Sequence, residues 1–288
     1  MQSHSPPAQL NRSALILLTA LAMVAFAGNS LLCRLALRGG DIDAASFTAL
    51  RIISGAAVLW LVLRTRAQRT GGNWPSALAL FVYAAAFSFA YLSLAAGTGA
   101  LLLFAAVQAT MIGFALSKGE RLHGHQWFGL VIAFAGLVLL LLPGIAAPPL
   151  VAALLMFSAG VAWGVYSLRG KRIPDATAAT AGNFIRAVPF ALILALACWP
   201  AQRITPTGFG YAFASGALTS GLGYVIWYAV LPSLPATSAA TVQLSAPVIA
   251  ALGGVLLLGE LMTLRILLAA VAVLGGIALV ITPRRAAP

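Results

Sequence analysis

Charged residues are scarce in this chain. They make up 8% of its 288 residues, and only five of them are acidic. A soluble domain carries about 25% charged residues, because it needs them to cover its surface. This scarcity excludes a water-soluble globular protein. Apolar sequence fills the chain instead: hydrophobic residues make up 61% and the mean hydropathy is +1.00. Apolar runs of about 20 residues, long enough to cross a bilayer, recur from end to end.

Acidic residues and histidines are missing from the apolar runs. All of them lie in loops, at the ends of runs or in the N-terminal tail (Asp41, Asp43, Glu120, Asp175, Glu260, His4, His123 and His125). An enzyme that works inside the membrane needs a nucleophile with a base, a carboxylate pair or metal ligands. We therefore predict that the chain is not an enzyme and holds no metal and no cofactor. Proton-driven carriers usually keep an acid or a histidine within the membrane, so we also expect no proton relay through a buried carboxylate.

Cysteine is equally rare. Cys33 and Cys198 fall inside apolar runs that are far apart in the sequence. That placement is typical of small apolar packing residues, and the spacing supports neither a disulfide nor a metal pair.

The charges that are present are mostly positive, with a net charge of +12. In a soluble protein this balance would suggest a nucleic-acid partner. Here the Lys and Arg residues lie almost entirely between apolar runs, and no basic stripe is interleaved with aromatic residues. We expect no nucleic-acid partner. The expected partners are small-molecule substrates and membrane lipid.

Proline, glycine and charge clusters divide the chain into ten apolar segments, which predict an all-α membrane protein with ten transmembrane helices. The segments cover residues about 14–37, 44–64, 75–95, 97–117, 124–142, 149–169, 176–198, 208–231, 235–258 and 262–282. The first of them, with "AFAGNS" after an apolar run, also resembles a signal peptide cleaved after Ala27. Because the apolar sequence continues to Leu37, we favour an uncleaved first helix.

One orientation gathers most of the positive charge on a single side. With the N-terminus inside, the inner loops hold Arg12, Arg64, Arg66, Arg69, Lys118, Arg121, Arg169, Lys171, Arg172, Arg284 and Arg285, and the outer loops hold Arg34, Arg38, Arg203 and Arg265. Inner loops of membrane proteins are enriched in Lys and Arg. We therefore predict that both termini are cytoplasmic.

The same pattern, an apolar run that closes on Gly-Glu, occurs twice. Gly119-Glu120 closes the fourth segment and Gly259-Glu260 closes the ninth, so the two pairs lie an odd number of spans apart. A pattern repeated on opposite sides of a membrane indicates an inverted repeat. Further matches between the halves are Arg51 with Arg186, Phe26 with Trp163, Tyr83 and Phe87 with Tyr224 and Tyr228, Gly136 with Gly276, and Pro143 with Pro283.

We place the joint between the repeats in "PGIAAPP" (residues 143–149) and expect five helices in residues 1–146 and five in residues 147–288. Two similar halves of opposite orientation can exchange conformations, which moves an opening from one face of the membrane to the other. Such alternating access is what a transporter needs.

Several motifs of the sequence resemble those of a known family. "FAGNSLLCRLA", Phe47 with Arg51, "GERL" at 119–122 and above all "SAPVIAALGGVLLLGE" are similar to motifs of the EamA-type drug/metabolite transporter superfamily. The resemblance covers nearly the whole chain. Two departures stand out: Phe26 replaces the family's Trp, and Val107 stands where Pro247 of the second repeat would predict a proline, so the fourth segment should be less bent.

Within that superfamily the chain resembles the aromatic amino-acid and metabolite exporters of the YddG type. The resemblance implies a bacterial inner-membrane protein with a central cavity, which is lined by the first, third, fourth, sixth, eighth and ninth helices. The implied function is export of aromatic or apolar amino acids and related metabolites. The alternatives are a carrier of drugs or nucleotide sugars, or a passive metabolite channel. We also expect a monomer, because the small-residue patterns Gly160-x-x-x-Gly164 and Ala272-x-x-x-Gly276 indicate packing within one bundle more than dimerisation.

Polar and aromatic residues deep in those helices are the candidates for substrate contact, because such residues in a membrane core usually face protein or water. They are Asn29, Tyr83, Phe87, Gln108, Trp163, Tyr166, Tyr224, Trp227, Tyr228, Gln243 and Ser245. Aromatic walls could stack planar side chains and hold cations weakly. The competing interpretation is core packing or an aromatic belt for the rings, and interhelical hydrogen bonds for the amides.

Three further residues have expected roles of another kind. Pro247 removes a backbone donor and should bend its helix, so it is a candidate hinge. Arg51 and Arg186 are basic residues well within spans, and a buried guanidinium needs a partner. We read both as structural or as ligands of a substrate carboxylate.

Overall fold

The structure is a computed structural model that describes residues 11–65, 69–119, 121–142, 147–170, 173, 175–234 and 236–281. Several residues named above lie outside these ranges, namely His4, Arg66, Glu120, Pro143, Lys171, Arg172, Pro283, Arg284 and Arg285.

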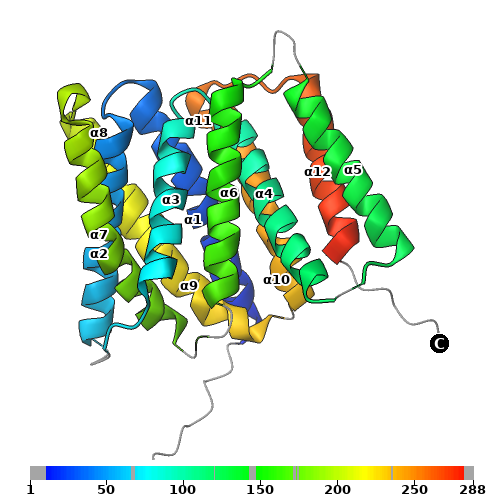
Figure 1. Cartoon of the computed structure of the whole chain (residues 1–288), viewed down its shortest axis with the longest axis horizontal. Coiled ribbons are helices and arrows are strands. Elements are labelled where there is room, and N and C mark those ends of the chain that lie inside the picture. Colours follow the sequence, from blue (N-terminus) through cyan, green and yellow to red (C-terminus); the bar gives the residue numbers. More distant parts are fainter. Residues whose placement is uncertain are drawn as a thin grey trace, which may run out of the picture.

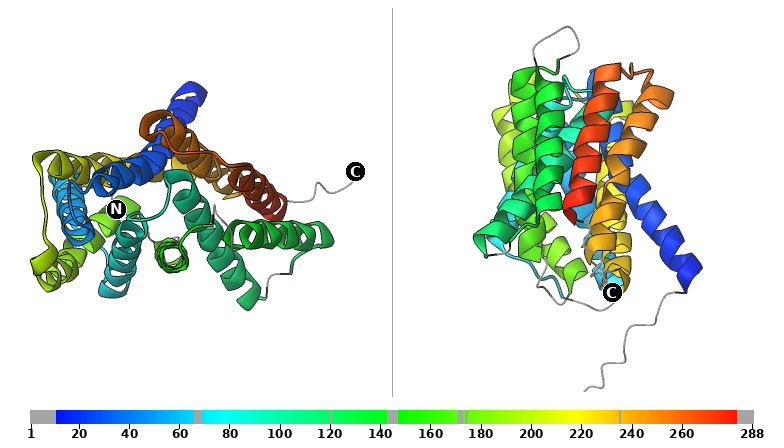
Figure 2. Two further views of the ribbon diagram at one scale, coloured as in Figure 1. Left: turned by 90° about the horizontal axis from the view of Figure 1, so that it is seen from above. Right: turned by 90° about the vertical axis from the view of Figure 1, so that its right-hand side faces the viewer.

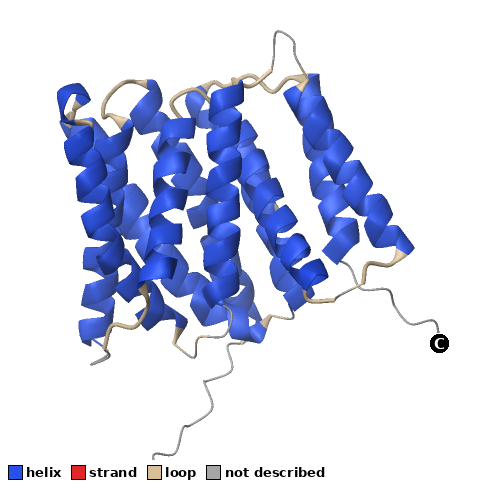
Figure 3. Cartoon of the chain, in the orientation of Figure 1, coloured by secondary structure: helices blue, strands red, loops and turns tan. Residues whose placement is uncertain are grey.

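The first half of the chain forms five helices in succession. They are α1 (Arg12–Arg38), α2 (Ala44–Thr65), α3 (Trp74–Ala90), α4 (Ala96–Ser117) and α5 (Gly124–Leu141). Figure 3 shows helices and loops, and no strand, in the part of the chain that the structure describes. Side-chain oxygens that cap exposed backbone N–H groups begin several of these helices: Asn11 accepts from the Ala14 amide, and Asn73 accepts from the Ser76 amide.

The second half repeats this plan with two of its helices interrupted. The helices are α6 (Leu150–Gly170), α7 (Ala176–Ala197), α8 (Pro206–Ala214), the π-helix η2 (Ser215–Leu222), α9 (Gly223–Val230), α10 (Ala236–Gln243), α11 (Ser245–Leu258) and α12 (Leu264–Ile281). Short 3-10 turns, η1 (Trp199–Ala201) and η3 (Leu231–Ser233), follow α7 and α9. The continuous α8-η2-α9 unit is the eighth predicted segment, and the α10-α11 pair is the ninth.

The described residues thus contain the ten predicted spans. Nine helical stretches are long and apolar enough to cross a membrane, and α3 is a shorter apolar helix. Their outer faces are apolar: Val151 is 72% exposed, Phe134 67% and Leu256 80%. An apolar surface of this kind belongs in lipid, so the chain is a multi-pass membrane protein.

The arrangement of the helices follows the repeat. α2 packs against α7, α4 against α11 and α5 against α12, so equivalent helices of the two halves meet. α3 packs against α6, and its counterpart α8-η2-α9 packs against α1 in the same way. This exchange of partners is the relation expected of two five-helix repeats related by a two-fold axis in the membrane plane. The inverted-repeat fold predicted from the sequence is confirmed.

Figures 1 and 2 show where these pairs lie. α5 and α12 stand side by side at one end of the molecule's long axis, and α2 and α7 lie toward the other. The helices between them carry the aromatic and polar candidates. α1 begins and α12 ends on the same side of the bundle (Figure 1), as an even number of crossings requires. The proposed boundary at residue 146 stays a prediction, because residues 143–146 lie outside the described ranges.

The ninth segment breaks at the place that its proline dictates. Proline lacks an N–H group, and its ring clashes with the carbonyl four residues earlier. For Pro247 that carbonyl belongs to Gln243, where α10 ends; Leu244 forms a turn and α11 begins at Ser245. In the first repeat, with Val107, α4 runs unbroken from Ala96 to Ser117. The expected difference in bending between the repeats is therefore present.

The π-helix in the eighth segment was not predicted. η2 lies against α2 with very little separation, and a Cβ atom at Gly216 would overlap the Arg51 carbonyl and the Ser54 hydroxyl. π-helical turns are rare and occur often at functional sites. Here η2 presents two buried hydroxyl groups, those of Ser215 and Ser220, to the centre of the bundle.

Candidate transport site

Trp163 is the centre of an aromatic cluster. Its ring centroid lies 4.9 Å from that of Tyr83, 5.2 Å from Tyr224 and 5.3 Å from Tyr166. These rings come from α3, α6 and α9, which belong to both repeats. The three tyrosines are buried, whereas Trp163 is only partly buried. The aromatic candidates predicted from separate helices are brought together here.

The cluster continues on both sides. Phe87 packs on Tyr83 with ring centroids 5.5 Å apart, and Phe26 packs edge-on against Tyr224 at 6.0 Å and Trp227 at 5.8 Å. The Phe26–Tyr224 contact joins the first and eighth segments, as the Trp163–Tyr83 contact joins the sixth and third. Edge-on and tilted ring pairs of this kind are the favoured geometries. The sequence match between Phe26 and Trp163 thus corresponds to equivalent places in the fold.

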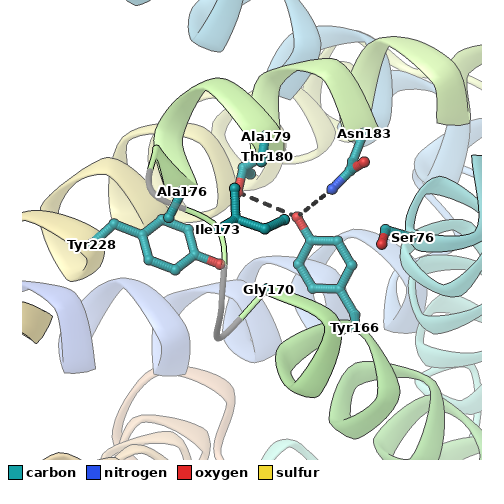
Figure 4. Close-up of a pocket in the computed structure, with 9 residues that line it drawn as sticks. All are labelled: Ser76, Tyr166, Gly170, Ile173, Ala176, Ala179, Thr180, Asn183 and Tyr228. Carbon is teal, nitrogen blue, oxygen red and sulfur yellow. Dashed lines mark hydrogen bonds between the residues drawn. The ribbon is translucent and has the colours of Figure 1, made fainter. Parts of the chain in front are cut away.

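A small pocket lies beside the cluster (Figure 4), lined by Ser76, Tyr166, Gly170, Ile173, Ala176, Ala179, Thr180, Asn183 and Tyr228. The Tyr166 hydroxyl donates to Thr180 Oγ1 at 3.3 Å and accepts from Asn183 Nδ2 at 3.4 Å. The walls are therefore the rings of Tyr166 and Tyr228 and a few neutral polar groups.

The pocket lies at one particular end of the bundle. Gly170 ends α6 and Ala176 begins α7, so the pocket borders the connection between the sixth and seventh crossings. After six crossings the chain is back on the side where α1 begins. The pocket thus belongs to the side that also holds the end of α12 (Figure 1).

A buried polar network lies deeper, behind Tyr83. Arg51 donates from Nη2 to the Tyr83 hydroxyl at 2.9 Å and from Nε to Ser220 Oγ at 3.2 Å. Asn29 donates to the same tyrosine hydroxyl at 3.2 Å and accepts from the Ser215 hydroxyl at 2.7 Å. These hydrogen bonds connect α1, α2, α3 and η2. Asn29 and Tyr83, proposed from sequence as substrate contacts, thus lie in one network with Arg51.

Arg186 has a different environment, although it matches Arg51 in the repeat. It donates from Nη1 to the Gly71 carbonyl at 2.7 Å and to the Gly182 carbonyl at 3.0 Å. Both acceptors are backbone groups, which tie α7 to the segment before α3. This geometry is that of a structural clamp, and it favours the structural interpretation for Arg186.

The remaining candidates lie in another part of the bundle. Gln108 is 5% exposed within α4, and Gln243 is half-buried at the end of α10. Ser245 donates to the Val242 carbonyl at 2.7 Å, so its hydroxyl forms a hydrogen bond within the helix break. Pro247, which follows the break, is buried. α4 packs against α6, the helix that carries Trp163, and also against α11, which lies beside α1. The structure places the two amides at the border of the site, and their role in substrate contact stays a prediction.

An ion pair closes the opposite side of the bundle. Arg34 Nε lies 3.1 Å from Glu260 Oε1, and the two side chains are 14% and 11% exposed. Glu260 Oε2 also accepts the Ala96 amide at 2.8 Å, at the start of α4, where no residue of that helix provides a side-chain cap. Arg34 Nη1 reaches the Tyr91 carbonyl at 3.0 Å. A carboxylate at a helix N-terminus is also favoured by the helix dipole.

This ion pair was not predicted from the sequence, where Gly259-Glu260 marks the repeat and Arg34 is placed in the outer loops. The available signal was a carboxylate directly after an apolar segment, preceded by Gly259, whose φ of 63° turns the chain. Glu260 now joins the ends of α1, α4 and α11, and its counterpart Glu120 lies outside the described residues.

Within the described part of the chain, no group of three or more His, Cys, Asp or Glu residues could hold a metal ion. The two cysteines are not paired with each other: both are free, and Cys33 is buried.

The chain is similar to several known proteins. Residues 150–282 match the EamA-like transporter family. The uncharacterized protein PA1977 of Pseudomonas aeruginosa is 56% identical, with 93% of this chain and 95% of that protein aligned. The uncharacterized transporter YwfM of Bacillus subtilis is 25% identical, with 76% and 77% aligned. A crystal structure of a protein with 20% identity superposes at a TM-score of 0.64 over 90% of this chain and 97% of its own, which shows a shared fold.

Proposed function

We propose that the chain is a transporter of the EamA-like family, which its residues 150–282 match, and that it exports amino acids with aromatic or apolar side chains, and related small metabolites, by alternating access. The observation that carries the proposal is the cluster around Trp163. Its ring is partly open and has three tyrosines from both repeats within 5.3 Å. A planar or apolar side chain can replace these ring contacts without leaving a polar group unpaired.

The two ends of the bundle suggest how access alternates. On one side the Arg34–Glu260 ion pair ties α1 to α11 and α4, and on the other side lies the pocket of Tyr166 and Tyr228. In this proposal the ion pair is an outer gate, and the pocket is the vestibule through which solute enters from the side of the termini. Opening the gate means separating α1 from α11, and the break at Pro247 is the hinge that allows α11 to move.

We further propose that the protein lies in a bacterial inner membrane with both termini cytoplasmic and works as a monomer. The charge distribution supports this orientation. A single chain supplies every ring and polar group of the site. Export then runs down the gradient of an accumulated metabolite, since the described spans offer no buried acid that could carry a proton.

The test is transport by purified protein in liposomes. We expect saturable counterflow of aromatic or apolar amino acids from a panel that also contains quaternary drugs and nucleotide sugars. Saturable flux of only a drug or a nucleotide sugar would overturn the substrate assignment. Flux that rises linearly with concentration would identify a passive channel instead.

Trp163→Ala tests the site in the same assay. Loss of the ring should lower flux by at least about fivefold, because a stacked aromatic contact is worth about 1 kcal/mol beyond the area that it buries. The matched control is Trp127→Ala in α5, where the ring is 51% exposed on the outer face. That variant should transport normally. Equal flux in both variants would remove the Trp163 cluster from the transport path.

A further inference from the structure

Arg51 is the largest fully buried side chain in the described part of the chain, and it is 2% exposed. No carboxylate compensates its charge: the salt bridge found among the described residues joins Arg34 to Glu260. A guanidinium in a membrane core is costly unless it is paired, and such residues commonly mark a functional site.

The groups that hold Arg51 are all neutral. Two hydroxyl oxygens, those of Tyr83 and Ser220, accept its Nη2 and Nε hydrogens. The aromatic faces of Tyr83 and Phe87 lie 5.0 Å from its central carbon atom, in cation–π contact. These partners fix the orientation of the guanidinium and leave its charge in place.

One nitrogen of Arg51 has no hydrogen-bond partner within the described residues, and that atom is Nη1. Buried polar atoms are almost always paired, so an unpaired donor needs an explanation. In Arg186, the partly buried equivalent residue of the second repeat, Nη1 donates to two backbone carbonyls. Nη1 of Arg51 has no such acceptor among the described residues.

We propose that Arg51 anchors the carboxylate of the transported solute through Nη1. The inference rests on the proposed transport function and names the class of substrate: a monocarboxylate with an aromatic or apolar body. A carboxylate accepts hydrogen bonds from a guanidinium in a planar, charge-assisted geometry, which is stronger than a neutral hydrogen bond. It would supply both the missing acceptor and the missing negative charge.

The position of Tyr83 supports this class of solute. Its ring centroid lies 5.0 Å from Arg51 Cζ and 4.9 Å from the Trp163 ring centroid. In this proposal, a solute whose carboxylate and ring are separated by a few bonds contacts Arg51 with the one and the aromatic cluster with the other. Trp163 in turn stacks on Tyr166, which lines the pocket. The contacts lead in order from the pocket through Tyr166, Trp163 and Tyr83 to Arg51.

The neutral surroundings of Arg51 suit a carrier. A fixed carboxylate beside the guanidinium would compete with the solute at all times. Hydroxyl groups and aromatic faces compete only weakly, so the solute binds and can still leave. Asn29 and the π-helix hydroxyl of Ser215 keep Tyr83 in place from the other side. In this proposal both are positioning residues.

The experiment is equilibrium binding to the purified full-length protein, with phenylalanine and phenylalaninamide as probes. The two molecules share ring and amine and differ in the carboxylate. Phenylalanine should bind at least about tenfold more tightly to the wild type, which is the effect of losing one charge-assisted hydrogen bond. Arg51→Gln should abolish this preference. Arg186→Gln, the matched control, should keep it even if the variant unfolds at a lower temperature.

Each outcome decides the proposal. Equal binding of acid and amide by the wild type, or no binding of either probe, overturns it, as does a preference that survives in Arg51→Gln. The wild-type comparison remains decisive if Arg51→Gln does not fold. An unfolding temperature of the protein that sodium chloride raises as much as phenylalanine does would place a small inorganic anion at Arg51 and contradict the assignment.

The outcomes also separate this inference from the transport function. Saturable phenylalanine transport without discrimination between acid and amide would contradict the role of Arg51 as an anchor and support the transport function. Preference for the acid without any amino-acid flux in liposomes would keep the anchor and remove the proposed export.

Discussion

At the scale of single residues, four arginines differ in the groups that hold their side chains. Arg186 and Arg265 end on backbone carbonyls, Arg265 on those of Leu139 and Leu140 at 2.8 and 2.9 Å. Arg34 is paired with Glu260. Arg51 alone among these four is fully buried with an unpaired nitrogen. Differences in partner, and not in residue type, therefore separate the proposed anchor from the clamps.

Glu260→Gln tests the gate at this scale. The amide keeps the shape of the side chain but loses the charge that pairs with Arg34 and caps α4. We expect the free energy of unfolding to fall by about 1–2 kcal/mol. We also expect the closed state to lose a similar stabilisation, so that α1 separates more often from α11.

Cys33, next to Arg34 and 0% exposed, reports that separation directly. In a Cys198→Ser background, Glu260→Gln should raise the rate of maleimide labelling at Cys33 by about tenfold, the change that corresponds to 1.4 kcal/mol. Asp41→Asn, which also removes a carboxylate near the end of α1, should leave the rate unchanged. An unchanged rate in Glu260→Gln would show that the ion pair does not control this side.

At the scale of elements, the irregular helices belong to the second repeat. α4 is continuous, whereas its counterpart is divided into α10 and α11; α3 is regular, whereas its counterpart contains the π-helix η2. The first repeat thus provides straight helices, and the second provides the break and the extra hydroxyl groups. This asymmetry places Ser215 and Ser220 against Asn29 and Arg51.

Pro247→Ala should restore a continuous helix across the ninth segment. The helix gains a backbone hydrogen bond, so we expect equal or higher thermal stability together with a slower transport rate, because the hinge is lost. The opposite change is Val107→Pro in α4, which should destabilise the protein by about 3 kcal/mol. Thermal unfolding and initial flux, measured on both variants, provide the check. Unimpaired flux in Pro247→Ala would end the role of this proline as a hinge.

The contact between α2 and η2 depends on Gly216. A Cβ at this position would overlap the Arg51 carbonyl and the Ser54 hydroxyl, so Gly216→Ala should push α2 away and destabilise the protein by about 1–3 kcal/mol. Gly210→Ala in the preceding helix meets no atom within 4 Å and should be neutral or slightly stabilising. Comparison of the two unfolding temperatures tests the prediction, and equal values would contradict the close packing.

The sequence predicted the elements better than their contacts. The apolar segments, their order and the repeat follow from hydropathy and from Gly119 and Gly259, because the length of a span is imposed by the bilayer. The break near Pro247 follows from the chemistry of proline. The π-helix could not be predicted, since its reason is the approach of α2, a contact between residues far apart in the sequence. For the same reason the Arg34–Glu260 pair and the unpaired nitrogen of Arg51 appear only in the fold.

At the scale of the whole molecule, two inverted units meet around the Trp163 cluster. α2 meets α7, α4 meets α11 and α5 meets α12, and the Arg34–Glu260 ion pair and the pocket lie on opposite sides of the bundle. A rocking motion that opens the gate and closes the pocket would use contacts that both halves already possess in similar form. Export requires that the pocket face the cytoplasm and the Arg34–Glu260 ion pair face outward, so the orientation of the protein in the membrane has to be known.

The topology of the intact protein in cells tests this central claim most directly. Lys118 and Leu261 are exposed and follow α4 and α11, the equivalent helices of the two repeats. With Cys33 and Cys198 replaced by serine, we place a single cysteine at one of these positions at a time. An impermeant maleimide added to intact cells should label Leu261→Cys at once and Lys118→Cys only after permeabilisation. Labelling of both variants from the same side would contradict the inverted architecture. Labelling of Lys118→Cys alone in intact cells would show that the protein has the opposite orientation in the membrane.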